Sequence, residues 1–268
     1  MKLTILMDNN TFIDQYYFGE PAVSYYIETE GKKILLDTGY SEILMRNAEL
    51  MGIDLSEITH IALSHSHNDH TRGLQFLQEK FDLSQVELIA HPRCFLPKYF
   101  DGGYIGAPYS EDEIAKIANY VPCTGVREIT DHLLFLGEIP RTNDFENQSP
   151  IGEYEKNGVR YDDYNMDDTA LVYKSDNGIF VITGCSHSGI CNIVEYAKKV
   201  CGDQRVIGVL GGFHLFEDDE QLKKTIEYLE SCKIDKLYPC HCVSLFARAK
   251  MMAKLPVVET GVGMQVEI

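Results

Sequence analysis

The chain has no tryptophan, few positive charges and no long apolar run. Its 268 residues include 24 lysines and arginines against 41 aspartates and glutamates, which gives a net charge of −17. A surface this negative repels polyanions, so nucleic-acid partners are not expected. No apolar run approaches the roughly 18 residues that span a bilayer, and the start of the chain does not resemble an export signal. The sequence therefore predicts a cytoplasmic protein without membrane partners; its oligomeric state stays open.

Disulfide bonds are also not expected, although the chain has eight cysteines. Reduced thiols are usual in a chain of this size that carries no export signal. Cys94, Cys123, Cys201 and Cys232 are expected to be small buried apolar residues. The other four lie close in sequence to candidate metal ligands: Cys185, Cys191, Cys240 and Cys242.

Hydrophobic periodicity predicts strands that alternate with helices in two similar halves. The first half reads as a hairpin at 24–36, a helix at 40–51 and strands at 60–64 and 86–90. The second half reads as strands at 171–173, 179–182, 206–210 and 236–238, with helices at 190–200, 218–231 and 243–254. This order predicts an α/β fold in which two sheets are covered by outer helices.

The pattern weakens between about 92 and 168. This stretch is rich in aromatic residues, and we predict an irregular insertion with one short helix near 111–120, within a single domain of residues 1–268. Long irregular segments in compact enzymes often form lids or pocket walls. For any one tyrosine, a place in a small aromatic core is equally expected.

The strongest motif is the segment His65-Ser66-His67-Asn68-Asp69-His70, which follows a predicted strand. Residues two apart in an extended segment point the same way, so His65 and His67 can hold one ion. Asp69 and His70, from the turn that follows, can face a second ion. Imidazole and carboxylate ligands suit zinc, iron or manganese. A solvated polar loop would not explain this spacing, and we predict a site for two divalent ions, with zinc favoured.

This segment fits the His-x-His-x-Asp-His motif of the metallo-β-lactamase superfamily, and Asp37-Thr38-Gly39 resembles its early Asp-Thr-Gly turn. The resemblance implies an αβ/βα four-layer sandwich with metals at one edge of two mixed sheets. The segments 137–141, 184–190, 211–215 and 239–242 resemble a subgroup often labelled as dihydropterin or ribofuranosylaminobenzene phosphate synthase-like. That label transfers weakly, because one fold hosts many substrates.

Two departures from the superfamily affect the expected ligands. A histidine usual before the strand at 171 is missing, and Gly184-Cys185-Ser186-His187 replaces a segment that usually carries a bridging aspartate. Of the two candidates there, we favour His187 over Cys185, because hard-ligand hydrolytic sites usually avoid a bridging thiolate. Asp168 is a weaker candidate. His241 stands where the last histidine ligand belongs, and two further histidines end strands and are additional candidates: His91 and His214.

Two metal ions can lower the pKa of a bridging water and supply hydroxide. Asp69 is expected to orient that nucleophile, and Asp37 to fix a histidine tautomer. Three arginines are candidates to bind an anionic substrate: Arg72, Arg93 and Arg141. We predict hydrolysis of a small phosphate ester or cyclic phosphodiester. The alternatives are a thioester, lactone or β-lactam hydrolase, an iron-binding redox protein that uses the four nearby cysteines, and a metal-binding sensor without turnover.

Overall fold

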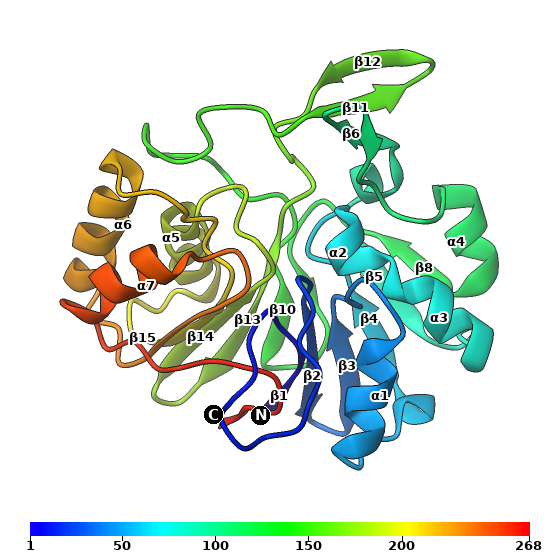
Figure 1. Cartoon of the computed structure of the whole chain (residues 1–268), viewed down its shortest axis with the longest axis horizontal. Coiled ribbons are helices and arrows are strands. Elements are labelled where there is room, and N and C mark those ends of the chain that lie inside the picture. Colours follow the sequence, from blue (N-terminus) through cyan, green and yellow to red (C-terminus); the bar gives the residue numbers. More distant parts are fainter.

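The computed structural model describes residues 1–268, and its strands form two large sheets that face each other (Figure 1). In spatial order, the first sheet contains β17 (Gln265–Glu267), β1 (Lys2–Met7), β2 (Ser24–Thr29), β3 (Lys32–Leu36), β4 (His60–Ala62), β5 (Glu87–Ala90) and β8 (Asn119–Pro122). The second contains β16 (Leu237–Pro239), β15 (Val206–Gly211), β14 (Gly178–Thr183), β13 (Ala170–Ser175), β10 (Leu133–Phe135) and β9 (Arg127–Glu128).

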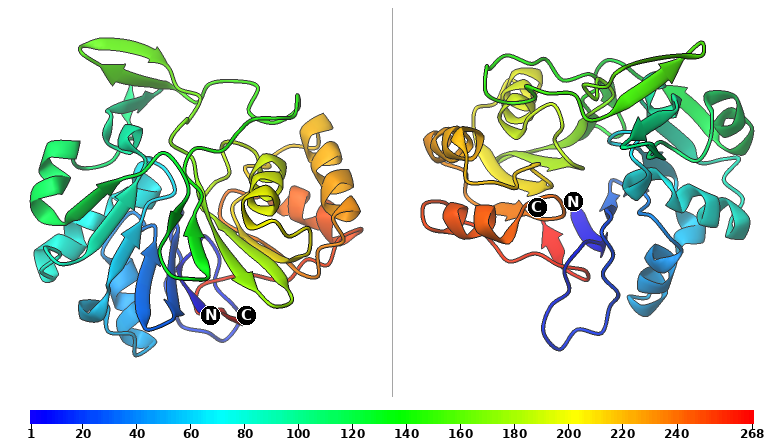
Figure 2. Two further views of the ribbon diagram at one scale, coloured as in Figure 1. Left: turned by 180° about the vertical axis from the view of Figure 1, so that it is seen from behind. Right: turned by 45° about the horizontal axis from the view of Figure 1, so that its top comes forward.

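Helices cover the outer face of each sheet (Figures 1 and 2). The first sheet is flanked by α1 (Ile43–Leu50), α2 (Asn68–Thr71), α3 (Gly73–Lys80) and α4 (Glu111–Ile117), with short 3-10 turns η1 (Leu55–Glu57) and η2 (Pro92–Phe95). The second is flanked by α5 (Ile190–Cys201), α6 (Glu220–Ser231) and α7 (Leu245–Met252). Both sheets mix parallel and antiparallel pairs. The predicted four-layer α/β sandwich is confirmed.

Alternation along the strands builds the layers. In β14, Phe180 and Ile182 point into the core between the two sheets, whereas Ile179 and Val181 point to the outer helices. Strand residues alternate sides with a period of two, so one strand contributes to two cores. A third cluster packs the first sheet against its own helices. Three apolar cores therefore separate the four layers.

Residues 92–168 are not the irregular insertion that the sequence suggests. β8, β9 and β10 extend the two main sheets, and a third sheet has the order β12 (Val159–Asp162), β11 (Glu153–Lys156), β6 (Lys98–Phe100), β7 (Gly103–Tyr104). These strands have two to four residues, too few to show a period in the sequence. The predicted helix near 111–120 is present as α4. The short terminal strand β17, which pairs with β1, was also not predicted from the sequence.

The turns after the parallel strands converge at one edge of the sandwich. β3, β4 and β5 run parallel in the first sheet, and β14, β15 and β16 run parallel in the second. Several residues just beyond these strands have left-handed backbone angles: Asp37 (φ 60°), Ser186 (φ 59°), His214 (φ 51°) and His241 (φ 52°). The chain reverses sharply there and brings polar side chains to the shared edge. None of the helices has the length and apolar character needed to cross a membrane.

Candidate metal centre

The loop after β4 supplies the histidine cluster. His65 and His67 lie in the loop, and Asp69 and His70 lie in α2, which begins at Asn68. The ring centres of His65 and His70 are 4.1 Å apart, and those of His65 and His67 are 4.6 Å apart. All three rings are buried. The segment that the sequence singled out is thus one compact group of imidazoles.

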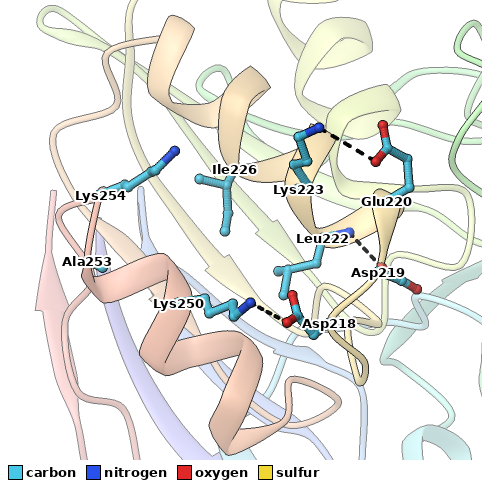
Figure 3. A pocket seen from close by; sticks show the side chains of 9 residues that line it. All are labelled: Asp218, Asp219, Glu220, Leu222, Lys223, Ile226, Lys250, Ala253 and Lys254. Carbon is cyan, nitrogen blue, oxygen red and sulfur yellow. Dashed lines mark hydrogen bonds and ion pairs between the residues drawn. The ribbon is translucent and has the colours of Figure 1, made fainter.

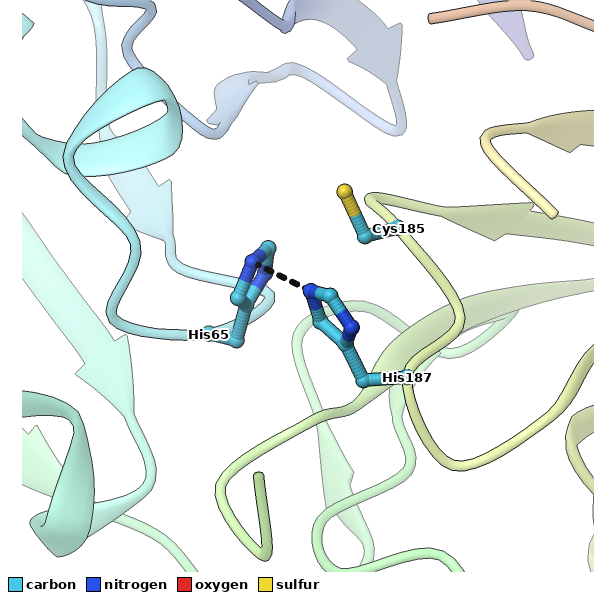
Figure 4. A group of neighbouring side chains, drawn as sticks. All are labelled: His65, Cys185 and His187. Atoms are coloured by element: carbon cyan, nitrogen blue, oxygen red, sulfur yellow. Dashed lines mark hydrogen bonds between the residues drawn. The ribbon is translucent and has the colours of Figure 1, made fainter. Parts of the chain in front are cut away.

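Two loops of the second sheet complete the cluster. Cys185 and His187 follow β14, and His241 follows β16. The Nε2 atoms of His65 and His187 are 3.2 Å apart, and the Cys185 side chain lies beside this pair (Figure 4). His70 Nε2 lies 3.2 Å from both Cys185 Sγ and His241 Nε2. Side chains from the edges of both sheets therefore meet at one point.

Hydrogen bonds at the Nδ1 atoms of three histidines determine that, in the neutral rings, their Nε2 atoms are unprotonated and available to a metal ion. Asp37 Oδ2 accepts from His70 Nδ1 at 2.7 Å and from the Ser64 hydroxyl at 2.6 Å. Because that hydroxyl gives its proton to Asp37, it accepts from His65 Nδ1 at 3.0 Å. His241 Nδ1 donates to Asn9 Oδ1 at 3.0 Å. In this assignment the three Nε2 atoms keep their lone pairs and face inward.

These atoms form two groups of potential ligands that share one member. His65, Cys185 and His187 make one group, His70, Cys185 and His241 make the other, and within each the ligand atoms lie within 4.8 Å of one another. Neighbouring ligand atoms around tetrahedral zinc are about 3.3–3.6 Å apart, from its usual bond lengths. The 3.2 Å contacts are within a few tenths of an ångström of that spacing. Inward-facing lone pairs at this spacing repel one another unless a cation lies among them, so the residues fit divalent metal ions.

The electrostatics of the cluster favour neutral His65, His67 and His187, a protonated His70 and an ionised Asp69. Burial holds the pKa of His65 and His187 well below the usual value and lowers that of His67 to about 3. Burial alone would raise the pKa of Asp69, but neighbouring His70 and His241 lower it overall. Burial would likewise lower the pKa of His70, yet Asp69 and Asp37 raise it to about 9. A metal ion would take the place of that proton.

Two predicted ligands stand beside the two groups. Asp69 Oδ2 lies 3.3 Å from His241 Nε2 and 3.6 Å from His70 Nε2, on the side of the second group. His67 Nε2 lies 3.1 Å from the amide nitrogen of Asn165. His67 and Asp69 both line a cavity that lies beside the cluster. Asn165 occupies the region where the sequence lacks the expected histidine.

A cavity of about 340 Å³ opens directly on the cluster. Its apolar wall includes Phe100, Ile105 and Ile151 from the segment around the third sheet, with Phe216 opposite. The 92–168 region therefore does form a pocket wall, as predicted. Several other aromatics there pair with one another: Tyr154 stacks on Tyr161 at 5.4 Å, and Tyr99 meets Tyr104 edge to face at 5.5 Å. A polar lobe of about 220 Å³ adjoins the cavity and shares three lining residues with it: Ile151, His187 and His214.

A larger hollow of about 590 Å³ lies between α6 and α7, away from the histidines (Figure 3). Lys250 points to Asp218 and Lys223 to Glu220, so two of its lysines are used in ion pairs within the hollow. It is lined by no histidine or cysteine. The cavity of about 340 Å³ beside the histidine cluster is therefore the candidate active site.

The additional histidine and aspartate candidates have mixed placements. His214 lines both lobes, and its ring centre is 4.6 Å from that of His187. His91 instead accepts from the Arg93 amide and lies 3.5 Å from Glu138, outside the cavity lining. Asp168 accepts from the Ser188 amide at 2.9 Å, so it fixes the loop that carries His187 and belongs to neither ligand group.

The three arginines do not line either lobe of the cavity. Arg72 lies over the Tyr40 ring at 4.3 Å, and Arg93 is exposed. Arg141 donates to Asn147 and to the carbonyl groups of residues 164 and 165. The Arg72 guanidinium group packs on Tyr40 and that of Arg141 anchors a loop, so the structure does not support the predicted substrate contacts.

The four cysteines near the motifs are separated. Cys191 lies in α5 and packs into the core between the second sheet and its helices, and Cys240 Sγ lies 3.1 Å from the Tyr25 hydroxyl in the core between the sheets. Only Cys185 and Cys242 line the cavity. A cluster with four thiolates is therefore not assembled, which removes the basis of the iron-cluster alternative.

Supporting residues that the sequence reading missed lie after β1. Asp8 Oδ1 accepts from the His241 amide at 2.8 Å, and Asn9 holds the His241 ring. The polar triplet Asp8-Asn9-Asn10 directly follows an apolar strand, and that pattern could have pointed to this edge.

Comparison with known proteins places these features in a family. An uncharacterised protein of Methanocaldococcus jannaschii is 34% identical over 253 residues, 93% of each chain. The 7,8-dihydropterin-6-methyl-4-(β-D-ribofuranosyl)-aminobenzene-5'-phosphate synthase of that organism is 29% identical, over 94% of this chain and 90% of its own. The crystal structure of Tm1679, a metal-dependent hydrolase of the β-lactamase superfamily, matches 100% of this chain and 99% of its own with 26% identity and a TM-score of 0.85. The family model for the superfamily matches residues 17–241, and the chain belongs to the metallo-β-lactamase superfamily.

Proposed function

We propose that this protein is a metal-dependent hydrolase with two divalent ions that cleaves a small phosphate ester or cyclic phosphodiester. The observation that carries the proposal is the pair of ligand groups at the floor of one cavity. Two adjacent ions are suited to hold both the attacking and the leaving oxygen of a phosphoryl centre.

The shape and charge of the cavity support a small anionic substrate. Its volume of about 340 Å³ suits a small molecule and not a polymer. No lysine or arginine lines it, so bound ions would be the nearest positive charges for a phosphate group. The apolar wall at Phe100 and Phe216 would hold a ring or other apolar part of the substrate. A relative whose name includes a 5'-phosphate product fits the same substrate class.

Bound divalent ions would supply a water molecule of lowered pKa and positive charge for the developing oxyanion. His65 and His187 would hold one ion, and His70 and His241 the other, through the Nε2 atoms that face inward. Asp69 lines the cavity and can accept a hydrogen bond from the attacking water. Asp37 keeps His70 in the tautomer that leaves Nε2 free.

The test is hydrolysis by protein loaded separately with zinc, manganese or iron. The substrates are bis-p-nitrophenyl phosphate, p-nitrophenyl phosphate, a p-nitrophenyl ester, a thioester, a lactone and a chromogenic β-lactam. We expect turnover of the diester or the monoester and its loss in His187→Ala and His241→Asn. Asparagine is chosen at 241 because it tolerates the left-handed backbone there.

His132→Ala is the matched control, because His132 is exposed and pairs with Glu30 away from the cluster. Turnover confined to the carbon esters, thioester, lactone or β-lactam would replace the phosphate proposal with that alternative. Absence of all turnover in protein that holds two metal ions would contradict the hydrolase proposal and favour a sensor. We also propose a cytoplasmic location, since a reducing compartment keeps the eight thiols free.

A further inference from the structure

Cys185 differs from every other candidate ligand in belonging to both groups. Its Sγ lies within 4.8 Å of the ligand atoms of His65 and His187 and of those of His70 and His241. Each histidine belongs to one group only. The thiol is buried and reaches the cluster from the loop after β14 (Figure 4). We propose that the Cys185 sulfur bridges the two metal ions as a thiolate, an inference that rests on the proposed two-ion centre.

The nearby carboxylates do not compete for this bridging position. Asp167 accepts from the Ser66 amide and from buried Lys98, and Asp168 accepts from the Ser188 amide. Asp69 approaches His70 and His241 but is in neither three-residue group. The usual carboxylate bridge therefore has no equivalent here, and sulfur takes its place. This reverses the preference for His187 at that position, while His187 keeps a place in the first group.

A second thiol supports the bridging sulfur. Cys242 Sγ donates to the Cys185 carbonyl oxygen at 3.5 Å, and Cys242 also lines the cavity. Gly212 makes room for this arrangement, because a Cβ there would lie 2.5 Å from Cys242 Sγ. This hydrogen bond holds the backbone of the residue whose sulfur would bridge the ions. Hydrogen bonds around a ligand help to orient it toward the metal.

A bridging thiolate changes which ions the centre accepts. Thiolates favour zinc and other soft or borderline ions, whereas carboxylates suit manganese and magnesium. Metal binding must also displace the Cys185 proton, so affinity falls as pH decreases. We expect the centre to bind zinc and cobalt and to discriminate against manganese.

Cobalt(II) titration of the full-length protein tests the bridge directly. Cobalt-bound thiolate gives a charge-transfer absorption that histidine and carboxylate ligands do not give. We expect this absorption to rise until two equivalents are bound, with two cobalt ions per chain by elemental analysis. Cys185→Ser should lose it, whereas Cys201→Ser, at the distant end of α5, should keep it.

The Cys185→Asp variant distinguishes loss of the bridging thiolate from misfolding of the site and from loss of hydrolysis. Aspartate can restore a carboxylate bridge, so the variant should bind two ions without the absorption and should gain affinity for manganese. Absorption that survives in Cys185→Ser, or stops rising after one equivalent in the unaltered protein, would overturn the inference. Two ions and the full absorption without turnover of any ester would keep the bridge and contradict the proposed hydrolase. Turnover by the cobalt-loaded protein without the absorption would keep the proposed hydrolase and contradict the bridge.

Discussion

Replacing Asp37 with asparagine should weaken metal binding without changing the shape of the site. Asp37 is fully buried and accepts three hydrogen bonds, from the Ser64 amide at 2.7 Å, the Ser64 hydroxyl and His70 Nδ1. Asparagine has the same size and tolerates the left-handed backbone at this position. The substitution therefore changes the hydrogen-bonding pattern and little else.

The size of the effect follows from which way the new amide must face. The Ser64 amide can only donate, so the asparagine oxygen has to remain opposite it, and the NH2 group then faces His70 Nδ1. His70 would carry its proton on Nε2, where the metal needs a lone pair. Loss of such a partner typically lowers metal affinity 10–100-fold, or about 1.4–2.8 kcal/mol. The opposite orientation would leave the buried Ser64 amide without an acceptor, at about 1–3 kcal/mol.

The assay is competition for zinc between the protein and a chromophoric chelator. Asp54→Asn is the matched control, because Asp54 is an exposed residue whose carboxylate accepts from Ser56. That variant should bind zinc as the unaltered protein does. Unchanged affinity for both ions in Asp37→Asn would refute the assigned role of Asp37 and the His70 tautomer.

Three further outcomes are expected from buried charges and from the cavity rim. Burial raises the pKa of Asp168 to about 6, so its protonated form is stable in the folded protein. Relative to Asp168→Asn, the free energy of unfolding should fall by about 3 kcal/mol as pH rises from about 3 to 7, and a flat difference in denaturant titrations would contradict this. Lys98→Met leaves buried Asp163 and Asp167 without their cation. This variant should lower the free energy of unfolding by about 3–5 kcal/mol, whereas the control Lys33→Met, at an exposed ion pair, should have no measurable effect. Phe216→Ala removes a half-exposed wall of the cavity and should raise KM about fivefold. Elemental analysis should find the metal content unchanged, and lost metal would mean that Phe216 supports the metal centre itself.

Much of the centre was predictable from a local motif and from the superfamily resemblance that the motif carries. The cluster from His65 to His70 lies within one loop, and strand-end position indicated where its side chains would point. His241 was predicted because the superfamily resemblance implies a histidine after a late strand. The apolar run at 179–182 likewise predicted the strand β14.

The remaining features depend on contacts between distant segments. The shared position of Cys185 arises only when the loops after β4, β14 and β16 meet, and no spacing in the sequence encodes that distance. Arg141 looked available in the sequence, but Asn147 and two carbonyl groups hold both of its terminal nitrogens. The strands of residues 92–168 are held by their partners in the sheets, and propensity over two to four residues could not reveal them.

The left-handed backbone at Asp37, Ser186, His214 and His241 has a consequence for the evolution of this edge. A non-glycine residue in that conformation costs of order 1 kcal/mol or more. Glycine or asparagine would relieve that cost at all four positions, so selection for thermal stability alone would favour replacing these side chains. Variants improved by such selection are expected to lose metal-centre residues first. Libraries aimed at a more stable protein should therefore hold these four positions fixed.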